Sequence, residues 1–253
     1  MTSSAAPQRD VRAHHNSRAL PVAFLPTPHD TRTPPPAMAA PPSFAHLLPP
    51  SFRELVRAFL AEDTPSFDIG GFVVGDAPEE AALLLKGAPP VSGAALGGVV
   101  LAGVPFFDAV FAELGCAVEW AAREGDVVHV PARVAVVRGP ARALLLGERT
   151  ALNILARASG VATDARHLVA IARAAGWAGE VAGTRKVTPG FRLVEKYALI
   201  VAGASTHRMD LSQMVMLKGA RAPANRAVHT RACRSRAAHP SPGTRASPCA
   251  SPH

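Results

Sequence analysis

The pattern of apolar and polar positions divides the chain into a folded middle and two tails. Residues 43–218 contain runs with strand or helix periodicity, whereas residues 1–42 and 219–253 do not. The first segment is rich in Pro, Ser, Ala and Arg, and the last contains no Leu, Ile, Met, Phe, Tyr or Trp. Segments this poor in large apolar residues cannot bury enough surface to offset the entropy of ordering. We therefore expect disordered extensions at 1–42 and 219–253.

The first part of the middle alternates between helical and strand periods. Ser51 and Glu54 form a capping box ahead of apolar residues spaced three or four apart, which predicts a helix ending near Asp63. Even-numbered residues from Val128 to Val136 are apolar and alternate with His129, Pro131 and Arg133, as in a strand with one buried face. Further strands are predicted at 81–85, 99–104 and 117–121, a helix at 106–114, and the last strand over 127–139. This mixture predicts an α+β sandwich over 43–147.

A helical period follows between Gly147 and Ala175. The pair Ser159-Gly160 predicts a break or kink that divides this segment into two helices. Gly176 is a natural stop because glycine readily adopts the left-handed conformation that ends many helices.

A strand–helix–strand pattern closes the folded middle. A short strand is predicted from Glu180 to Thr184, a helix beginning at Thr188-Pro189, and a second strand at 214–218. Such units form parallel sheets, and two strands cannot make that sheet alone. Residues 148–218 are therefore expected to hold linking helices and the first part of an α/β barrel. On the helix, Arg192, Glu195 and Lys196 are expected to pair with one another on an exposed face, without binding a ligand.

The charge distribution excludes a nucleic-acid groove. The net charge is +8, yet residues 43–218 contain 17 Lys and Arg against 17 Asp and Glu. The excess of basic residues therefore belongs to the tails, and a neutral folded region lacks the basic surface that binds phosphate backbones. We expect no nucleic-acid partner.

Three cysteines without a CxxC pair predict neither a disulfide framework nor a metal site, which favours a reducing, cytoplasmic compartment. The uncharged run 87–107 is rich in Gly, Ala and Pro, so we interpret it as a loop and a buried strand, not a membrane span. A mitochondrial presequence is an alternative interpretation of the Arg-rich first tail. Met38 is also a plausible authentic start, which would make 1–37 an upstream extension.

Cationic residues occur where predicted elements end. They are Arg185-Lys186, His207-Arg208 and Lys218. Arg presents a fork that matches a carboxylate and Lys a compact charge, so this spacing indicates a pocket for a multiply anionic small molecule. Solvated surface charge is the alternative interpretation.

Several motifs resemble one enzyme family, the quinolinate phosphoribosyltransferases of vertebrate type. The likeness extends over about residues 43–218. Its main motifs are Leu-Leu-Pro-Pro at 47–50, Leu-Ala-Gly-Val-Pro-Phe-Phe-Asp at 101–108, Arg-Gly-Pro-Ala at 138–141, Leu-Gly-Glu-Arg at 146–149, Gly-Thr-Arg-Lys at 183–186, Thr-Pro-Gly-Phe-Arg-Leu-Val-Glu-Lys at 188–196, His207-Arg208 and Met-Val-Met-Leu-Lys at 214–218.

The resemblance implies a Mg²⁺-dependent transfer of phosphoribose from phosphoribosyl pyrophosphate to quinolinate. Loss of CO₂ then gives nicotinate mononucleotide, a step of NAD biosynthesis. The implied fold is an N-terminal sandwich on an incomplete α/β barrel, with the site at the C-terminal ends of the barrel strands. The implied assembly is a homodimer or higher homo-oligomer.

The resemblance also implies a role for each site residue. Arg185, Lys186, His207 and Arg208 would grip quinolinate, with Lys186 also facing the cosubstrate. Arg149 would reach quinolinate in the neighbouring subunit. Lys218 would face the cosubstrate, and Lys186 and Lys218 would act in catalysis. No covalent nucleophile is required.

The chain departs from the family pattern directly after Lys218. The family continues with Asp-Asn-His and then with strands that carry the acidic residues for ribose and Mg²⁺ and a glycine-rich phosphate loop. Here Gly-Ala-Arg-Ala-Pro follows. We therefore expect a chain truncated within the barrel, without Mg²⁺ ligands and with little activity of its own. The alternative is a non-catalytic subunit that pairs with or regulates the full-length enzyme.

Overall fold

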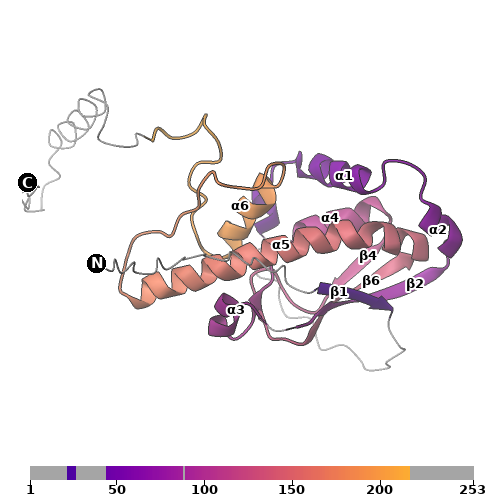
Figure 1. Cartoon of the computed structure of the whole chain (residues 1–253), viewed down its shortest axis with the longest axis horizontal. Coiled ribbons are helices and arrows are strands. Elements are labelled where there is room, and N and C mark those ends of the chain that lie inside the picture. Colours follow the sequence, from indigo (N-terminus) through magenta and orange to yellow (C-terminus); the bar gives the residue numbers. More distant parts are fainter. Residues whose placement is uncertain (1–21, 27–43, 88, 217–253) are drawn as a thin grey trace, which may run out of the picture. The chain divides into compact units, whose positions relative to one another are not determined.

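The computed structural model describes residues 22–26, 44–87 and 89–216 (Figure 1). The described residues up to Met209 belong to one compact unit, and those from Asp210 to a second. The elements are β1 (Val22–Pro26), a 3-10 turn η1 (Phe44–Leu47), α1 (Phe52–Asp63), α2 (Ile69–Val74), β2 (Pro78–Leu85), α3 (Val91–Leu96), β3 (Val99–Val100), α4 (Val104–Glu113), β4 (Ala117–Trp120), β5 (Val127–Val128), β6 (Ala132–Pro140), α5 (Ala141–Ala174) and α6 (Arg192–Val201).

A four-stranded antiparallel sheet with the order β1-β2-β6-β4 forms one layer, and β3 and β5 form a separate pair. Helices α4 and α5 pack against these strands, which confirms the predicted mixed α/β class. Residues 22–26, assigned above to a disordered extension, instead form edge strand β1 paired with β2. The prediction was wrong here because average composition hides a short apolar run.

An irregularity in β6 corrects the predicted buried face. Leu83 pairs with Ala135 and Leu84 with Arg133, so Val134 is an extra residue opposite β2. A bulge of this kind moves the following side chains to the opposite face. Accordingly Ala135 and Val137 are fully buried, whereas Val136, which the alternation placed in the core, is only partly buried.

The helix predicted from 51 is confirmed as α1, but its capping box does not form. Ser51 has helical backbone angles and its side chain makes no capping hydrogen bond. The turn begins earlier, because the Phe52 N–H donates to the carbonyl of Pro49 at 2.9 Å. A residue already in helical conformation cannot present its hydroxyl to the next turn as a cap does.

Helix α5 is continuous through Ser159-Gly160, so the predicted break is wrong. Ser159 and Thr163 are buried and face the end of β3 and the loop that follows it. The Thr163 hydroxyl accepts from the Val100 N–H at 3.0 Å and donates to the Ser159 carbonyl at 2.7 Å. The small polar residues therefore hold a loop against an intact helix.

Two arginines of α5 hold the ends of α6. Arg157 bonds the region before α6, and Arg166 donates to the carbonyls of Val201 and Ala202 at 2.9 and 3.0 Å. The last carbonyls of a helix lack partners within it, and a cation there is favoured by the helix dipole. Helix α6 is thereby fixed along α5.

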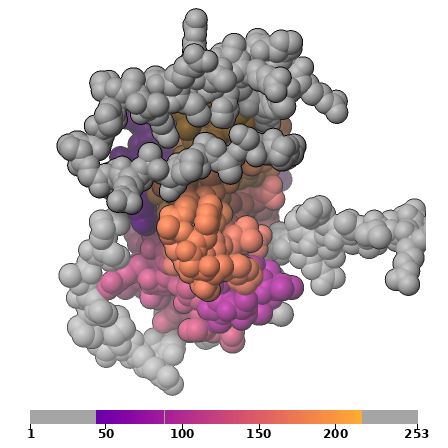
Figure 2. All heavy atoms as spheres, turned by 90° about the vertical axis from the view of Figure 1, so that its left-hand side faces the viewer, coloured from indigo at the N-terminus to yellow at the C-terminus, as the bar shows by residue number. Residues whose placement is uncertain are grey.

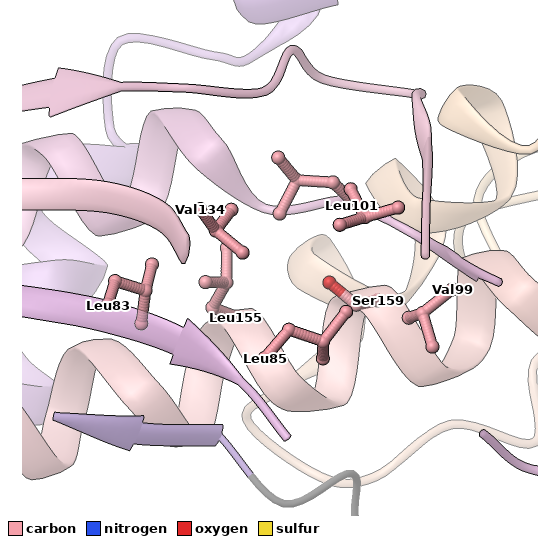
Figure 3. A pocket seen from close by; sticks show the side chains of 8 residues that line it. Leu83, Leu85, Val99, Leu101, Val134, Leu155 and Ser159 are labelled. Carbon is pink, nitrogen blue, oxygen red and sulfur yellow. The ribbon is translucent and has the colours of Figure 1, made fainter. Parts of the chain in front are cut away.

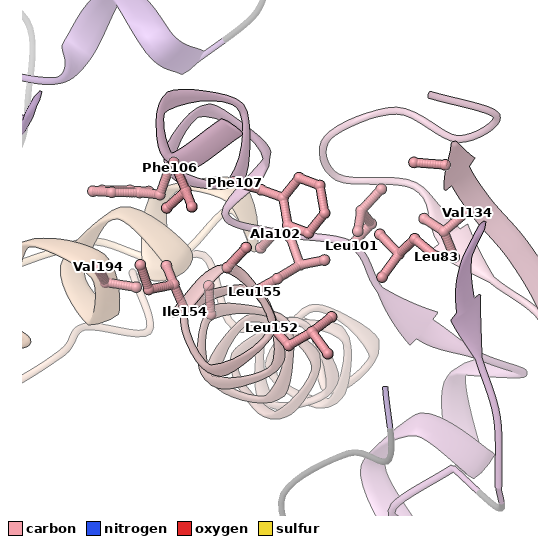
Figure 4. Close-up of a cluster of buried hydrophobic side chains, with 14 of the residues drawn as sticks. Leu83, Leu101, Ala102, Phe106, Phe107, Val134, Leu152, Ile154, Leu155 and Val194 are labelled. Atoms are coloured by element: carbon pink, nitrogen blue, oxygen red, sulfur yellow. The ribbon is translucent and has the colours of Figure 1, made fainter. Parts of the chain in front are cut away.

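The core lies between the sheet, α4, α5 and α6 (Figure 4). Phe106 of α4 is fully buried and packs edge-on against Phe52 of α1 and Tyr197 of α6, with ring centroids 5.6 Å apart in each pair. Val194 of α6 lies in the same cluster as Ile154 of α5. One apolar core therefore joins the sandwich to α6.

A small void remains beneath the sheet (Figure 3). It measures about 20 Å³ and is lined almost entirely by aliphatic side chains of both strand groups and α5. Ser159 is the polar member of the lining, and its hydroxyl is already hydrogen-bonded. A void of this size could hold one water at most, and a water needs several polar partners. It is a packing defect, not a ligand site.

On the face shown in Figure 2, the C-terminal part of α5 lies next to α3. Buried Ser92 of α3 donates to the carboxylate of Asp164 on α5. Beyond α5 the predicted strand 180–184 is reduced to a single parallel bridge between Ala182 and Ser205. Residues 214–216 are not a strand, and 217–218 lie outside the described residues.

Candidate anion-binding site

Two chain segments that flank α6 run side by side in the same direction. The bridge between Ala182 and Ser205 is closed by two hydrogen bonds, from the Gly183 N–H to the Ser205 carbonyl at 2.8 Å and from the Ser205 N–H to the Val181 carbonyl at 2.9 Å. Arg185 and Arg208 each lie three residues beyond it. The parallel direction therefore carries the predicted cationic pairs toward the same end of the two segments.

The first segment presents Arg185 and Lys186, and both are exposed. A tight local turn shapes it. The Lys186 N–H donates to the Thr184 hydroxyl and the Val187 N–H to the Arg185 carbonyl, both at 3.0 Å. Gly183 allows the segment to approach α6, because an added Cβ would lie 2.3 Å from Leu199.

The second segment presents His207 and Arg208, which are half-buried. His207 has a φ of 54°, in the left-handed region that non-glycine residues seldom occupy. Its N–H donates to the Ser205 hydroxyl at 3.3 Å, and its carbonyl accepts from the Thr206 hydroxyl at 3.0 Å. Such conformations persist where surrounding contacts impose them and are concentrated at functional sites.

Glu195 and Lys196 do not behave as predicted. The expected exposed face with mutual pairing is wrong, because Glu195 is only 8% exposed and Lys196 only 1%. Glu195 accepts from Arg157 at 3.0 Å and from the Thr188 hydroxyl at 2.8 Å. Lys196 donates to the carbonyls of Thr206 and Arg208, the latter at 3.2 Å. Both residues thus contact the cation-bearing segments.

The sequence itself indicates that Glu195 and Lys196 are buried and need internal partners. Between Leu193 and Ala204 they are the only charged residues, and every other residue is apolar or glycine except Tyr197. A helix that is apolar on nearly all sides is enclosed, so its charged residues need internal partners. Burial lowers the pKa of the Lys196 amine, and the nearby Arg192 acts in the same direction.

The remaining predicted residues stand apart from these segments. Arg149 lies on α5, is 63% exposed and contacts Glu148 only at 3.6 Å. No other described residue pairs with it in an ion pair. Lys218 lies outside the described residues. The structure therefore brings together the Arg185-Lys186 and His207-Arg208 segments and leaves Arg149 facing outward.

Residues 183–209 are strongly cationic. They contain five Lys and Arg and a single acid, Glu195, which is paired with Arg157. Among the described residues, no group of three His, Cys, Asp or Glu side chains converges as a metal site requires. Within the same ranges, no helix combines the length and apolar character needed to cross a bilayer. The arrangement suits a small anion with several negative charges.

A separate acidic cluster lies next to α6. Glu124 accepts from the Gly103 and Val104 N–H groups, both at 2.9 Å, at the start of α4. Burial raises its pKa to about 7, and burial also raises the pKa of Asp108, which accepts from the Trp120 indole. The buried Tyr197 hydroxyl meets no acceptor in hydrogen-bond geometry among the described residues. Burial first, and the nearby Glu124 carboxylate second, raise its pKa.

Comparison with known proteins places the chain in one enzyme family. Residues 73–159 match the family model for the N-terminal domain of quinolinate phosphoribosyl transferase, and residues 161–242 match the model for its C-terminal domain. The second match extends beyond Lys218 into a segment outside the described residues. Together the two matches span more than half of the chain.

Individual relatives point the same way. The nicotinate-nucleotide pyrophosphorylase [carboxylating] of Homo sapiens is 53% identical over 175 residues, which cover 69% of this chain and 56% of the relative. The Dictyostelium discoideum protein of the same name is 42% identical over 186 residues, covering 67% of this chain and 59% of that protein. The chain thus spans a little more than half the length of these curated relatives.

Solved structures give the same fold. The nicotinate-nucleotide pyrophosphorylase of Francisella tularensis superposes with a TM-score of 0.61 at 26% identity, covering 77% of this chain and 68% of that chain. NadC from Streptococcus pyogenes gives 0.60 at 31% identity, with 74% and 65% covered. The fold that the chain shares with these structures is of the mixed α/β class. The chain belongs to the quinolinate phosphoribosyltransferase family.

Proposed function

We propose that this chain binds quinolinate and contributes to the transfer of phosphoribose from phosphoribosyl pyrophosphate, with decarboxylation to nicotinate mononucleotide, CO₂ and pyrophosphate. The observation that carries the proposal is the parallel alignment of the Arg185-Lys186 and His207-Arg208 segments. The names of the relatives support the same reaction.

The charge chemistry fits this substrate. Quinolinate has two adjacent carboxylates, and an arginine can hold each with paired hydrogen bonds. Arg185 and Arg208, each three residues beyond the bridge in sequence, are suited to the two carboxylates. Lys186 and His207 add charge, and Lys186 and Lys218 are proposed to face the phosphates of the cosubstrate.

These residues would act mainly by positioning and charge stabilisation. Transfer passes through an oxocarbenium-like ribose, so the protein must align the pyridine nitrogen with the ribose and stabilise the departing negative charge. The cationic pyridinium nitrogen then favours loss of the adjacent carboxylate as CO₂. No side chain needs to form a covalent bond.

Mg²⁺, proposed as the cofactor from the family resemblance, finds no converging set of ligands among the described residues. We therefore assign it no residues here.

A homodimer completes the proposed site. Arg149 is exposed and is proposed to reach quinolinate bound by the partner. Helix α2, which packs on α5, supports an interface, because Phe67, Phe72 and Val73 around it are 88%, 85% and 78% exposed. Exposed apolar patches of this kind mark interaction surfaces. The cytoplasm is the proposed location, although one Nicotiana tabacum relative is named mitochondrial.

The proposal is tested by two measurements on the purified chain. Titration calorimetry should detect binding of quinolinate by the chain. Nicotinate, which lacks one carboxylate, should bind much more weakly. A product assay with phosphoribosyl pyrophosphate and Mg²⁺ then measures nicotinate mononucleotide. Absence of quinolinate binding by the chain would overturn the proposal. Binding without turnover, together with a change in the activity of an added full-length relative, would favour the non-catalytic subunit.

A further inference from the structure

We propose that Glu195 and Lys196 are positioning residues, adjacent on α6, that hold the two cation-bearing segments in the geometry needed for a dianionic substrate. We call this pair the α6 clamp. The choice of ligand rests on the proposed function, whereas the clamp itself rests on hydrogen bonds between described residues.

Lys196 holds the second segment on both sides of His207. Its ammonium group donates to the carbonyl before His207 and to the carbonyl after it. Two carbonyls drawn to one nitrogen impose the direction of the intervening peptide, which explains how His207 keeps its left-handed φ of 54°. Without the ammonium group, this segment would lose the contacts that oppose relaxation of that strain.

The burial of Lys196 fits this role. Its side chain is 1% exposed, and in the described part of the chain no carboxylate lies within ion-pair distance. A buried ammonium needs partners for its donors, and here two backbone carbonyls accept from two of its three N–H groups. The nitrogen also lies 3.6 Å from the point where a Cβ on Gly183 would project. It therefore sits beside both segments at the level of their bridge.

Glu195 holds the first segment. Its carboxylate accepts from the Thr188 N–H at 3.2 Å and from the Thr188 hydroxyl at 2.8 Å, two residues after Lys186. Arg157 of α5 donates to the same carboxylate at 3.0 Å and to the Thr188 hydroxyl at 2.7 Å. The loop that carries Arg185 and Lys186 is thus tied through Glu195 to the longest helix.

Helix geometry lets neighbours serve different segments. Successive residues of an α-helix point about 100° apart, because there are about 3.6 residues per turn. One side of α6 therefore reaches the loop before it, and the adjacent side reaches the loop after it. A single short helix sets the relative position of both cationic pairs.

The test uses the full chain with substitutions at the clamp and one matched control. Lys196→Met removes the donors while keeping length, and Glu195→Gln keeps shape while removing charge. Lys196→Gln, which retains two N–H donors, is the second variant if Lys196→Met does not fold. Arg192→Met is the control, because Arg192 is an exposed cation on the same helix. Hydrogen exchange by mass spectrometry and quinolinate titration are measured for each variant.

We expect the Lys196 variants to exchange amides of 203–209 at least fivefold faster, and Glu195→Gln those of 184–190, with α1 unchanged. Quinolinate binding should weaken at least tenfold in the clamp variants and less than twofold in Arg192→Met. Unchanged exchange in both segments would overturn the clamp. Faster exchange with unchanged quinolinate affinity would overturn its positioning role.

The two proposals fail separately. If the wild-type chain does not bind quinolinate, the proposed function is wrong, while the exchange data still decide whether the clamp holds the segments. If the wild-type chain binds quinolinate and the clamp variants retain both affinity and slow exchange, the clamp is wrong and the proposed function stands.

Discussion

The hydroxyl of Ser159 on α5 both donates to the carbonyl of Ala102 and accepts from its N–H, each at 3.1 Å. One side chain thus satisfies both backbone groups of a fully buried residue in the loop between β3 and α4. The bonds exist because the helix runs unbroken past Ser159 and brings its hydroxyl to that loop.

Replacing Ser159 with alanine should therefore destabilise the fold. Two buried backbone groups would lose their partner, and each such loss costs about 1–3 kcal/mol. We expect the free energy of unfolding, measured with urea, to fall by roughly 2–4 kcal/mol on the same basis. Asn153→Ala, an exposed position on α5, is the control and should change it by less than about 0.5 kcal/mol. Equal effects at the two positions would contradict the role of the hydroxyl.

Two glycines of α5 should respond in opposite directions to alanine. A Cβ on Gly147 would lie 2.8 Å from both Leu114 and Phe111, whereas a Cβ on Gly160 would meet nothing within 4 Å. Gly147→Ala should cost about 1–3 kcal/mol through overpacking. Gly160→Ala should stabilise the helix by about 0.5–1 kcal/mol, because glycine loses more backbone entropy. Thermal unfolding of the pair checks this, and a destabilised Gly160→Ala would show that the helix needs flexibility there.

Glu124 should make stability depend on pH. Its pKa rises from 4.5 to about 7 on burial, so between these values the folded state retains a proton that the unfolded chain has lost. The free energy of unfolding should therefore fall as pH rises from 4.5 to 7, by up to roughly 3 kcal/mol from this group.

Glu124→Gln isolates that contribution. The amide does not titrate, so the difference in unfolding free energy between wild type and variant should shrink or reverse across this interval. The variant also loses one acceptor for the N–H groups of Gly103 and Val104, which offsets its stability by a constant amount. Parallel curves for the two proteins from pH 4.5 to 7 would show that Glu124 does not carry the raised pKa.

Arg149 should act in the partner's site. Arg149→Ala and Arg185→Ala should each abolish quinolinate binding while leaving unfolding unchanged. A refolded mixture of the two variants should recover about a quarter of the wild-type sites, because half of the dimers are mixed and each holds one intact site. No recovery in confirmed mixed dimers would place Arg149 in its own subunit's site or outside the site.

The sequence predicted several elements well and buried polar contacts poorly. The single strand predicted over 127–139 was wrong, because it is two strands, β5 and β6, in different sheets. Helix α4 and strands β2 and β4 lie close to their predicted bounds because long apolar periods record which side is buried. Predictions from local sequence signals were wrong where contacts with a distant segment determined the structure. The local sequence Ser159-Gly160 predicts a helix break. In the folded chain the Ser159 hydroxyl bonds the loop at Ala102 and the helix continues.

The same limit applies to the site. The cationic pairs were predictable because they lie at element ends and match family motifs. The contacts of Lys196 were not, since they join it to carbonyls 10 and 12 residues away through a turn with no periodic signal. A side chain's partners depend on how the chain folds back, which the spacing of residues along α6 does not record.

The continuity of α5 has a consequence for how the molecule can vary. The two family domains meet at residue 160, inside this single helix. Inserting one residue there would advance everything downstream by about 1.5 Å and rotate it by about 100°. Arg166 would move together with α6, whereas Arg157 upstream would no longer face Thr188 and Glu195. Insertions or deletions at this junction should thus be tolerated only in whole helical turns. The length of α5 therefore fixes the rotation of the cationic segments relative to the sandwich.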